Sequence, residues 1–532
     1  MSLRTAYPVV VVGAGPAGLA VAVSLARQGV ECLVVERRRQ GSELPRATVL
    51  SLRTMEVLRS WGLEERILDG ADDVEMAMLE TVTAADAANG TRYDVGYPTA
   101  AQSAVVSPTR VACVAQDHLE AVLFDHLASL PAATVLRGAE AVGLRNRSGR
   151  TQVTLEDGSG RRRTVRATHV VAADGVKSRI RSELGIEMVG REGIFHGAMV
   201  EFRAPLWDVL GEHRYGVYAI THPQGSGVLL PAGQGDRWLF AVEWDREARP
   251  VNAETDARLR RHIEAASGQA GIDVRMERVM WFSTGAQVAQ RFSQGNVFLV
   301  GDSAHRVTPR GGTGLNTAFA SGCDLGWKLA WVHRGWAGSE LLATYELERR
   351  PQAEHNVIRS ADPFGSRREV ITEMQVDLAG RVRHEWLVDP GAGEPRRSTL
   401  DLVADGLTLF TGPQSRDWST AAATVAVDVP VTVVALPSVT ARALGIASSG
   451  ALLVRPDALP VASWSAPFAA DVQLSQAIGA LTGRPSRQLA VDEQPMVWAH
   501  LGGLAPVVDP RAAVHYGKTR TADGSADGRL TG

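Results

Sequence analysis

The sequence predicts an α/β protein: a parallel-sheet domain, a sheet-based lobe inserted into it, and a small α/β domain near the C-terminal end. Three observations support this prediction. A glycine-rich βαβ pattern opens the chain, short aromatic-rich strands fill residues 188–285, and alternating strand patterns return after residue 390. With 532 residues and 45% hydrophobic content, the chain can bury several cores, which agrees with two or three domains.

The composition argues against several classes of function. Lys and Arg number 56 against 59 Asp and Glu, so the net charge is -3 and no bulk attraction to a nucleic acid is expected. Cys32, Cys113 and Cys323 are widely separated, form no CxxC and leave one cysteine unpaired in any disulfide scheme. This usage favours a reducing, cytoplasmic setting.

The first segment predicts a strand, a helix and a second strand. Residues 8–12 are a valine run typical of a buried parallel strand, residues 17–27 carry small and apolar side chains at helical spacing, and residues 30–36 form another apolar run. The same stretch could be taken for a signal peptide or a membrane span. Its central glycines and prolines and the acidic end of the second strand favour the βαβ unit, so no membrane partner is expected.

Three glycines lie between that strand and helix as GxGxxG: Gly13, Gly15 and Gly18. The first permits a tight turn, the second lets the backbone approach a pyrophosphate, and the third allows close helix packing. Pro16 and Ala17 begin the helix, whose free amides and partial positive charge favour phosphates.

The second strand ends in an acid. Glu36 follows the last glycine by 18 residues, where a carboxylate can accept both hydroxyls of an adenosine ribose, and Arg37 comes next. The unit as a whole predicts a bound dinucleotide. It leaves open whether that dinucleotide is NAD(P) or FAD.

The remaining elements are predicted in order along the chain. They are a helix and turn at 50–70, an amphipathic helix at 117–130, strands with glycine turns from 133 to 175, the sheet-based lobe, and long helices at 321–361. The polar, Gly-rich last residues are expected to be disordered.

The segment VFLVGDSAHRVTPRGGTGLN (297–316) ends an apolar strand with an aspartate and continues into a Pro/Gly-rich loop. It resembles the second flavin-binding signature of the class A flavoprotein monooxygenases, the FAD-dependent aromatic hydroxylases. In that family the aspartate accepts hydrogen bonds from the ribityl chain, and the loop and following helix bring amides to the pyrophosphate and the isoalloxazine edge. The resemblance implies FAD and gives these roles to Gly301, Asp302, Pro309, Gly312, Gly314, Leu315 and Asn316.

Three more matches to the same family lie between the two glycine clusters. Asp174 begins a DGxxSxxR pattern that the family links to FAD and to the nicotinamide cofactor. Arg46 matches the arginine that borders the mobile flavin, and Gln116 matches a glutamine that contacts the ribityl chain. The ordered motifs make the resemblance specific over roughly residues 8–350.

The resemblance also implies a domain organisation. Residues 1–187 and 286–385 would form a glutathione-reductase-type FAD-binding Rossmann domain, and residues 188–285 a substrate-binding β-sheet lobe. Residues 386–485 resemble the thioredoxin-like domain of phenol hydroxylase and polyketide hydroxylase relatives. No cysteine follows Cys323, so this domain is expected to be structural or to form a subunit contact. Residues 486–532 would be a C-terminal extension.

The resemblance implies an FAD- and NAD(P)H-dependent monooxygenase that hydroxylates an aromatic, polycyclic polyketide-type substrate through a flavin C4a-hydroperoxide, with O2 as co-substrate. Because no second GxGxxG is present, NADPH or NADH is expected to bind transiently. No metal is expected, and the protein would be a monomer or a homodimer. Two alternatives stay open: a Baeyer-Villiger or epoxidising monooxygenase of the same fold, and a non-catalytic FAD protein that sequesters a reactive intermediate.

Few catalytic side chains are expected, since the cofactor carries the chemistry. Arg46 is one candidate, and His196, His222 and Tyr215 are candidates for removing a proton from a phenolic substrate. His305 is expected to pack and to orient its loop. The other lobe aromatics could stack on a substrate, but core packing is their commoner role; they are Tyr218, Trp238, Phe240 and Trp281.

Two departures from the family pattern leave the substrate open. The usual Asp-Ala in the helix after Asn316 is replaced by SGCD, and Arg310 occupies a loop position that a smaller or apolar residue commonly fills.

Overall fold

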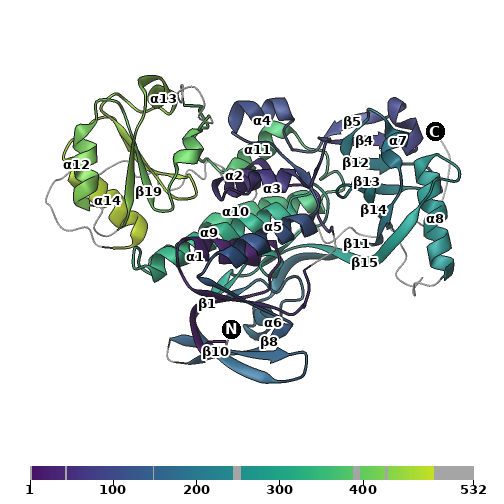
Figure 1. The fold of residues 1–532 in the computed structure, drawn as a ribbon, viewed down its shortest axis with the longest axis horizontal. Coiled ribbons are helices and arrows are strands. Elements are labelled where there is room, and N and C mark those ends of the chain that lie inside the picture. Colours follow the sequence, from purple (N-terminus) through teal and green to yellow (C-terminus); the bar gives the residue numbers. More distant parts are fainter. Residues whose placement is uncertain are drawn as a thin grey trace, which may run out of the picture.

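The computed structural model describes residues 3–41, 45–147, 149–243, 253–387, 396–425 and 429–484. The predicted C-terminal extension at residues 486–532, including the end that is predicted to be disordered, lies outside them. Three sheet-based units are visible: one around β1 and β10, one around β11 to β15, and one around β19 (Figure 1).

The first sheet is built on parallel strands. β1 (Ala6–Val12) pairs with β2 (Cys32–Glu36) and β10 (Arg162–Ala172), β2 pairs with β7 (Ala133–Arg137), and β10 pairs with β17 (Val297–Leu299). The valines at the centre of β1 are fully buried, as the valine run predicts for a strand covered on both faces. α1 (Pro16–Arg27) and α9 (Gly314–His333) pack against each other beside this sheet. The predicted βαβ unit is confirmed.

Parallel strands bring their carboxyl ends to one edge of the sheet. Gly13 follows β1, Glu36 ends β2, Asp174 follows β10, and Asp302 follows β17. Residues that are almost 290 positions apart in the sequence therefore face one crevice, as expected for ligand sites of open α/β sheets.

The second sheet has the strand order β18-β15-β11-β14-β13-β12-β4-β5. Its strands from the predicted lobe are β11 (Met188–Arg203), β12 (Tyr215–Ile220), β13 (Gly227–Pro231), β14 (Arg237–Glu243) and β15 (Arg275–Ala289). The sheet extends beyond the predicted range 188–285, because β4 (Glu75–Thr81) and β5 (Thr91–Asp94) add to its edge beside β12 and β18 (His305–Arg306) adds beside β15.

The core of this second sheet confirms the packing role of several aromatic residues. Phe202, Tyr218, Trp238 and Phe240 are fully buried between the sheet and α8 (Ala253–Ser267). The Tyr218 hydroxyl donates to the His213 carbonyl at 2.8 Å, which satisfies its polar atom inside the core.

Two long strands join the first unit to the second. β11 and β15 pair in antiparallel from Met188 opposite Ala289 to Arg203 opposite Arg275, and they run from the first unit into the second (Figure 1). Their register shifts between Glu192 and Phe195. A bulge of this kind bends a strand and re-aims its side chains.

Further helices and an antiparallel extension complete the first unit. They are α2 (Leu52–Ser60), α3 (Glu64–Leu68), α4 (Ala100–Val106), α5 (Gln116–Ser129), α6 (Arg179–Glu183), α10 (Glu340–Ala361), α11 (Val370–Leu378), β8 (Ala139–Arg147) and β9 (Arg150–Asp157). The helix predicted at 50–70 is divided in two at Gly62, whose φ of 73° suits glycine and ends α2.

The C-terminal unit has the strand order β20-β19-β21-β22. β19 (Leu407–Thr411) and β20 (Val431–Ala435) are parallel around α12 (Arg416–Val425), while β21 (Ala451–Val454) and β22 (Pro460–Trp464) add in antiparallel. α13 (Ser438–Ala443) and α14 (Ala470–Thr482) complete a β-α-β-α-β-β-α order. This arrangement confirms the thioredoxin-like fold.

A buried cluster of charges connects this C-terminal unit to α9 and α10. Lys328, which is fully buried, donates to Asp324 at 2.9 Å and lies 3.1 Å from Glu348. Arg455, at the end of β21, makes two hydrogen bonds to Glu348 at 3.0 and 2.7 Å and also pairs with Asp457. The five side chains form one network across the boundary, called here the interdomain charge cluster.

Candidate active site

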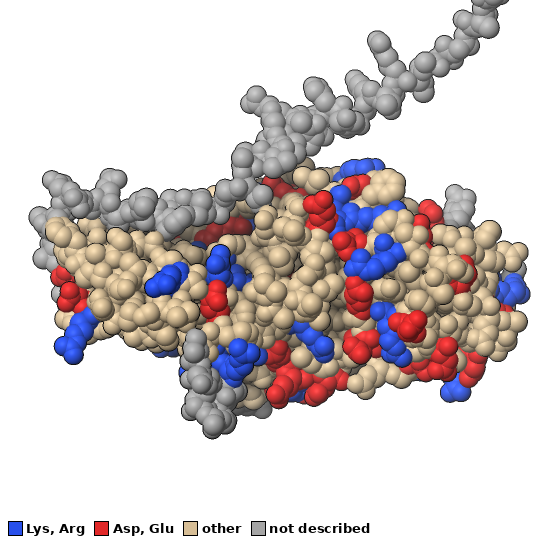
Figure 2. Space-filling view, turned by 90° about the horizontal axis from the view of Figure 1, so that it is seen from above, with Lys and Arg blue, Asp and Glu red and all other residues tan. Residues whose placement is uncertain are grey.

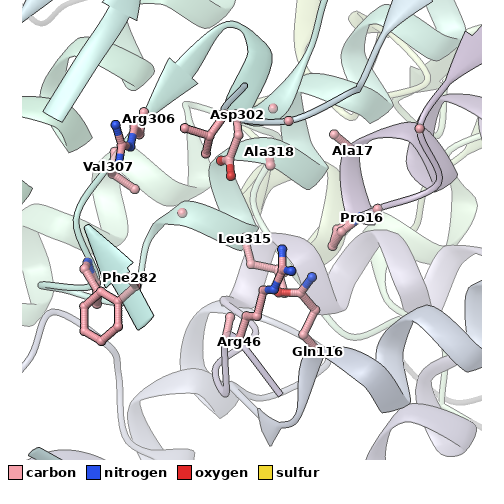
Figure 3. Close-up of a pocket in the computed structure, with 18 of the residues that line it drawn as sticks. Pro16, Ala17, Arg46, Gln116, Phe282, Asp302, Arg306, Val307, Leu315 and Ala318 are labelled. Carbon is pink, nitrogen blue, oxygen red and sulfur yellow. The ribbon is translucent and has the colours of Figure 1, made fainter. Parts of the chain in front are cut away.

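A single cavity of about 2210 Å³ lies between the carboxyl edge of the first sheet and the inner face of the second. Residues from β1, β2, α9 and the segments that follow β10 and β17 line one end, and residues from β11 to β15 line the other. Figure 3 shows side chains of these segments, Asp302 and Pro16 among them, around the same space. This volume is large enough to receive a dinucleotide together with a second molecule.

The glycine cluster has the geometry of a pyrophosphate cradle. Gly13 has a φ of 104°, and an added Cβ would lie 2.2 Å from the Ala173 carbonyl oxygen. An added Cβ on Gly18 would lie 2.0 Å from the Gly13 carbonyl oxygen, so helix and strand touch there. Gly15, in contrast, faces open cavity with no atom within 4 Å. These positions fit a dinucleotide whose phosphates approach Gly15 and the amino end of α1.

Carboxylates stand at three points around this cradle. Glu36 accepts hydrogen bonds from the amides of Ala14 and Arg38, both at 2.9 Å, which fixes its carboxylate at the end of β2. Oδ1 of Asp174 is buried and has no hydrogen-bond partner among the described residues. Asp302 opens into the cavity rather than to the outer surface, and its deep position raises its pKa, partly offset by Arg46 and Arg306.

Oδ1 of Asp174 calls for a donor that the described residues do not supply, and the Asp302 carboxylate opens into the same cavity. Hydroxyl groups of a ribityl or ribose chain are such donors. The glycine cradle, Glu36 and Asp302 therefore fit FAD, with the adenosine end at Glu36 and the flavin end toward Asp302.

Arg46 and Gln116 lie together on the opposite wall (Figure 3). The backbone N–H of Gln116 donates to the Ala47 carbonyl at 2.9 Å, which ties the start of α5 to the segment of Arg46. Burial is the main cause that lowers the pKa of Arg46, and the nearby Arg38 adds to it.

Glu120 is a wall residue that the sequence did not indicate. It is 4% exposed, and it accepts a hydrogen bond from Gln116 Nε2 at 2.7 Å, one helical turn away on α5. The side-chain Nε2 of Gln116 therefore donates to Glu120, and the side-chain Oε1 can accept a hydrogen bond from a ligand hydroxyl. Burial raises the pKa of Glu120 to about 7, while Gln116 and Arg46 act in the opposite direction.

We expect Glu120→Gln to stabilise the apoprotein at pH 8. The folded pKa of Glu120 lies above its usual value of 4.5, so the buried carboxylate costs stability above pH 7 and the cost disappears below pH 4.5. The glutamine keeps an acceptor for Gln116 and removes the charge. Urea denaturation of apoprotein should give a gain of about 2 kcal/mol at pH 8, shrinking toward pH 5. A gain that is the same at both pH values would contradict this assignment.

The loop 309–316 is fixed from below by Tyr97. The Tyr97 hydroxyl donates to the Gly312 carbonyl at 3.0 Å, and Asn316 Nδ2 donates to the same hydroxyl at 3.4 Å. Asn316 Oδ1 in turn accepts from the Ser51 amide at 2.9 Å. The amides of the loop are thus held in place before any ligand binds, which is the preorganisation that a flavin site needs.

The far end of the cavity is an apolar chamber formed mainly by the inner face of the second sheet. Its walls include Val49, Met76, Val95, Tyr97, Met199, Val217, Val228, Leu230, Met280, Trp281 and Phe282. Phe282 and Phe195 have ring centroids 5.6 Å apart. Such a chamber suits a flat, apolar molecule that stacks on aromatic rings.

The structure separates the three candidates for phenol deprotonation. His196, half-buried on β11 just after the bulge, lines the chamber. Tyr215 and His222 are not among the cavity-lining residues. A register shift between Tyr215 and Val217 turns the Tyr215 ring onto Tyr218, 6.3 Å away, and His222 accepts from the Gln224 amide beyond the end of β12.

His305 packs in the core, whereas Trp281 lines the cavity. His305 is 1% exposed, bonds Ser321 Oγ at 3.2 Å, and its burial lowers its pKa to about 3, so it packs as expected. Trp281, by contrast, lines the chamber.

Fold and site together define a flavoprotein in which one cavity connects an FAD cradle with an aromatic chamber. Comparison with known families agrees: residues 6–360 match the FAD binding domain family, and residues 377–485 match the C-terminal domain of aromatic-ring hydroxylases. The chain therefore belongs to the FAD-dependent aromatic-ring hydroxylases, which are monooxygenases, and FAD is its cofactor.

Individual relatives point the same way. The chain is 30% identical to "Tetracenomycin A2 monooxygenase-dioxygenase" of Streptomyces glaucescens, over 87% of this chain and 93% of that protein. It is 37% identical to a "Putative polyketide hydroxylase" of Streptomyces halstedii, over 66% of this chain and 64% of that protein's length. It is 31% identical to "Aklavinone 12-hydroxylase RdmE" of Streptomyces purpurascens, over 85% of this chain and 94% of that protein.

Solved structures share the whole architecture. Aklavinone-11 hydroxylase in complex with FAD and aklavinone has a TM-score of 0.80 at 29% identity, covering 91% of this chain and 100% of its own. The flavin-dependent monooxygenase PieE, in complex with FAD and substrate, has a TM-score of 0.81 at 25% identity with the same coverage. The predicted family, fold class and cofactor are confirmed. Within the described residues, no helix is both long and apolar enough to cross a membrane.

Proposed function

We propose that this chain hydroxylates a polycyclic, polyketide-type aromatic compound with FAD, NADPH or NADH, and O2. The observation that carries the proposal is the continuity of the cavity, because a substrate in the apolar chamber would lie directly beside the flavin end of the cradle. Relatives named for tetracenomycin and aklavinone support a substrate of several fused rings. The chamber's aromatic and methionine side chains support the same class.

The residues of this chain would divide the work by position. Gly13, Gly15 and Glu36 would hold the adenosine half of FAD, and Asp302 would bind the ribityl chain together with Gln116. Pro16, Ala17 and Gly18 would form the helix start, and Arg37 and Asp174 the rim. The loop residues would present amides to the flavin edge; they are Gly301, Pro309, Gly312, Gly314, Leu315 and Asn316.

Bound FAD would supply the redox chemistry, namely reduction by the nicotinamide cofactor and activation of O2. Arg46 would place a cation beside the flavin, and the enclosed chamber would exclude water from the reacting oxygen. His196 is the proposed acceptor of a phenolic proton, since it is the candidate base that lines the chamber.

The surface charges and the cysteines support an enzyme that acts on a small molecule in a reducing compartment. Acidic and basic side chains are interspersed over the face seen in Figure 2, with no large patch of one sign. Cys32 and Cys113 are buried and unbonded and Cys323 is half-buried, which favours a reducing, cytoplasmic location. We propose a monomer or a homodimer, to be decided by light scattering.

The proposal is tested by NADPH consumption with a panel of anthraquinones and naphthacenequinones, and by mass spectrometry of the products under labelled O2. A hydroxylated product carrying one labelled oxygen is expected. An inserted ester oxygen or an epoxide would favour the other monooxygenase reactions, and a yellow protein without any aromatic-stimulated turnover would favour sequestration.

His196→Asn is expected to lower kcat about a hundredfold with little change in the Kd of FAD.

A further inference from the structure

Seven of the eight Lys and Arg side chains that line the cavity fall into two groups. Three are already paired inside the protein: Arg179 with Glu183, Arg181 with two backbone carbonyls, and Arg306 with the Ser283 carbonyl and Glu192. Four others lie after β2 and β10, around the dinucleotide cradle, where the phosphates and the flavin of the cofactor would be their partners; they are Arg37, Arg38, Arg46 and Lys177.

Arg310 belongs to neither group. It is half-buried, it lines the cavity, and no described residue accepts a hydrogen bond or forms an ion pair with its guanidinium. Its electrostatic effect reaches Asp362, whose pKa it helps to lower, but Asp362 is already paired with Arg368 at 2.6 Å. The guanidinium is thus a partly desolvated cation that still lacks an anion.

The loop beneath Arg310 is rigidly held. The Arg310 amide donates to Thr308 Oγ1 at 3.3 Å, and Thr308 Oγ1 donates to the Ser360 carbonyl at 2.7 Å. Two residues further on, the Gly312 carbonyl accepts from Tyr97. The site of the cation is therefore fixed before binding, which lowers the entropic cost of forming an ion pair.

The apolar chamber, where the substrate is proposed to bind, shares wall residues with the surroundings of Arg310. Val95, Tyr97 and Ser366 line the same cavity as Arg310, and the Tyr97 hydroxyl bonds the Gly312 carbonyl in the Arg310 loop. β5, which precedes Val95, is the edge strand of the second sheet. One cation among apolar walls matches one planar, singly charged group. A carboxylate meets this description, because guanidinium and carboxylate pair through two parallel hydrogen bonds.

We propose that Arg310 binds a carboxylate on the polycyclic substrate and thereby selects acidic substrates over neutral ones. The proposal rests on the proposed function, since it concerns the substrate of that reaction. It names Arg310 as a specificity residue, at the loop position where the family commonly has a smaller or apolar side chain.

The test uses two anthraquinones that differ at one position: rhein, which carries a carboxylate, and chrysophanol, which carries a methyl group there. Each is titrated into FAD-loaded protein, and the Kd is read from the change in the flavin absorbance bands. Arg310→Gln is expected to weaken rhein binding about tenfold and chrysophanol binding less than about twofold, and Arg310→Lys should lie between. The exposed Arg275→Gln is the matched control and should change neither Kd.

An equal change for both compounds in Arg310→Gln, or no change for either, overturns the carboxylate site. If chrysophanol binds normally but rhein shows no selective loss, only the carboxylate site is contradicted and the proposed hydroxylase function stands. If the wild-type protein binds neither compound and no aromatic of the panel stimulates NADPH consumption, both proposals fail.

Discussion

Gly15→Val is expected to abolish FAD binding and to leave the fold of the apoprotein unchanged. Gly15 has φ near -75° and ψ near -178°, a conformation that valine adopts readily, and an added Cβ meets no protein atom within 4 Å. The side chain instead fills the space through which a pyrophosphate must approach the backbone. Purified Gly15→Val should be colourless, with the Kd of FAD raised at least about a hundredfold and the Tm of the apoprotein within about 1 °C of wild type.

Gly18→Ala is the matched variant with the opposite signature. Its Cβ would lie 2.0 Å from the Gly13 carbonyl oxygen and 3.1 Å from the Ala173 Cβ, so helix and strand must separate. The apoprotein should lose about 1 to 3 kcal/mol of stability, measured by urea denaturation. Were Gly15→Val yellow at full stoichiometry, the pyrophosphate could not lie where the cradle places it.

Lys328→Met is expected to lower the free energy of unfolding by about 3 to 5 kcal/mol. The interdomain charge cluster contains three carboxylates, Lys328 and one guanidinium, so removing the ammonium leaves buried negative charge with a single cation. Burial raises the pKa of Asp324. Burial acts in the same direction on Glu348, but Lys328 and Arg455 together outweigh it and lower the pKa of Glu348. Urea denaturation followed by tryptophan fluorescence measures the loss, because Trp327 and Trp331 lie in the same helix.

The control for this variant is an ion pair in water. Arg275 and Asp273 pair at 2.9 Å, but their side chains are 75% and 66% exposed, so Arg275→Met should cost less than about 0.5 kcal/mol. Equal effects of the two variants would mean that the interdomain charge cluster does not stabilise the boundary.

The cofactor half of the site was predictable because its signals are local. Strand, glycines, helix and acid follow one another between Val9 and Glu36, and each has a backbone or hydrogen-bonding reason for its position. The second signature at Asp302 needed the family resemblance, since one aspartate before a glycine loop fits many structures.

The substrate half was less predictable because it depends on contacts between distant segments. β4 and β5 join the second sheet from residues 75–94, although their short alternating pattern gives no hint of their partner strand. The bulge near Tyr215 decides which ring faces the chamber, and bulges leave no clear sequence signal. Glu120 was missed in the sequence; the signal that could have found it is its spacing of four residues from Gln116 on one helix.

The departure SGCD also finds a physical explanation. Its last residue, Asp324, points into the interdomain charge cluster, where it accepts from Lys328 one turn along α9. A sequence change in the flavin-side helix is thus linked to the attachment of the thioredoxin-like unit.

The long antiparallel pairing of β11 with β15, which runs from Met188 to Arg203 on β11, constrains how this protein can change over evolutionary time. Because both strands belong to the cofactor-binding body and to the chamber wall, the wall cannot swing away as an independent lid. New compounds must be accommodated by exchanging inward-facing side chains on a fixed frame. Directed evolution that randomises Met199, Val217, Leu230 and Met280 should therefore broaden the range of ring systems accepted without raising the Kd of FAD.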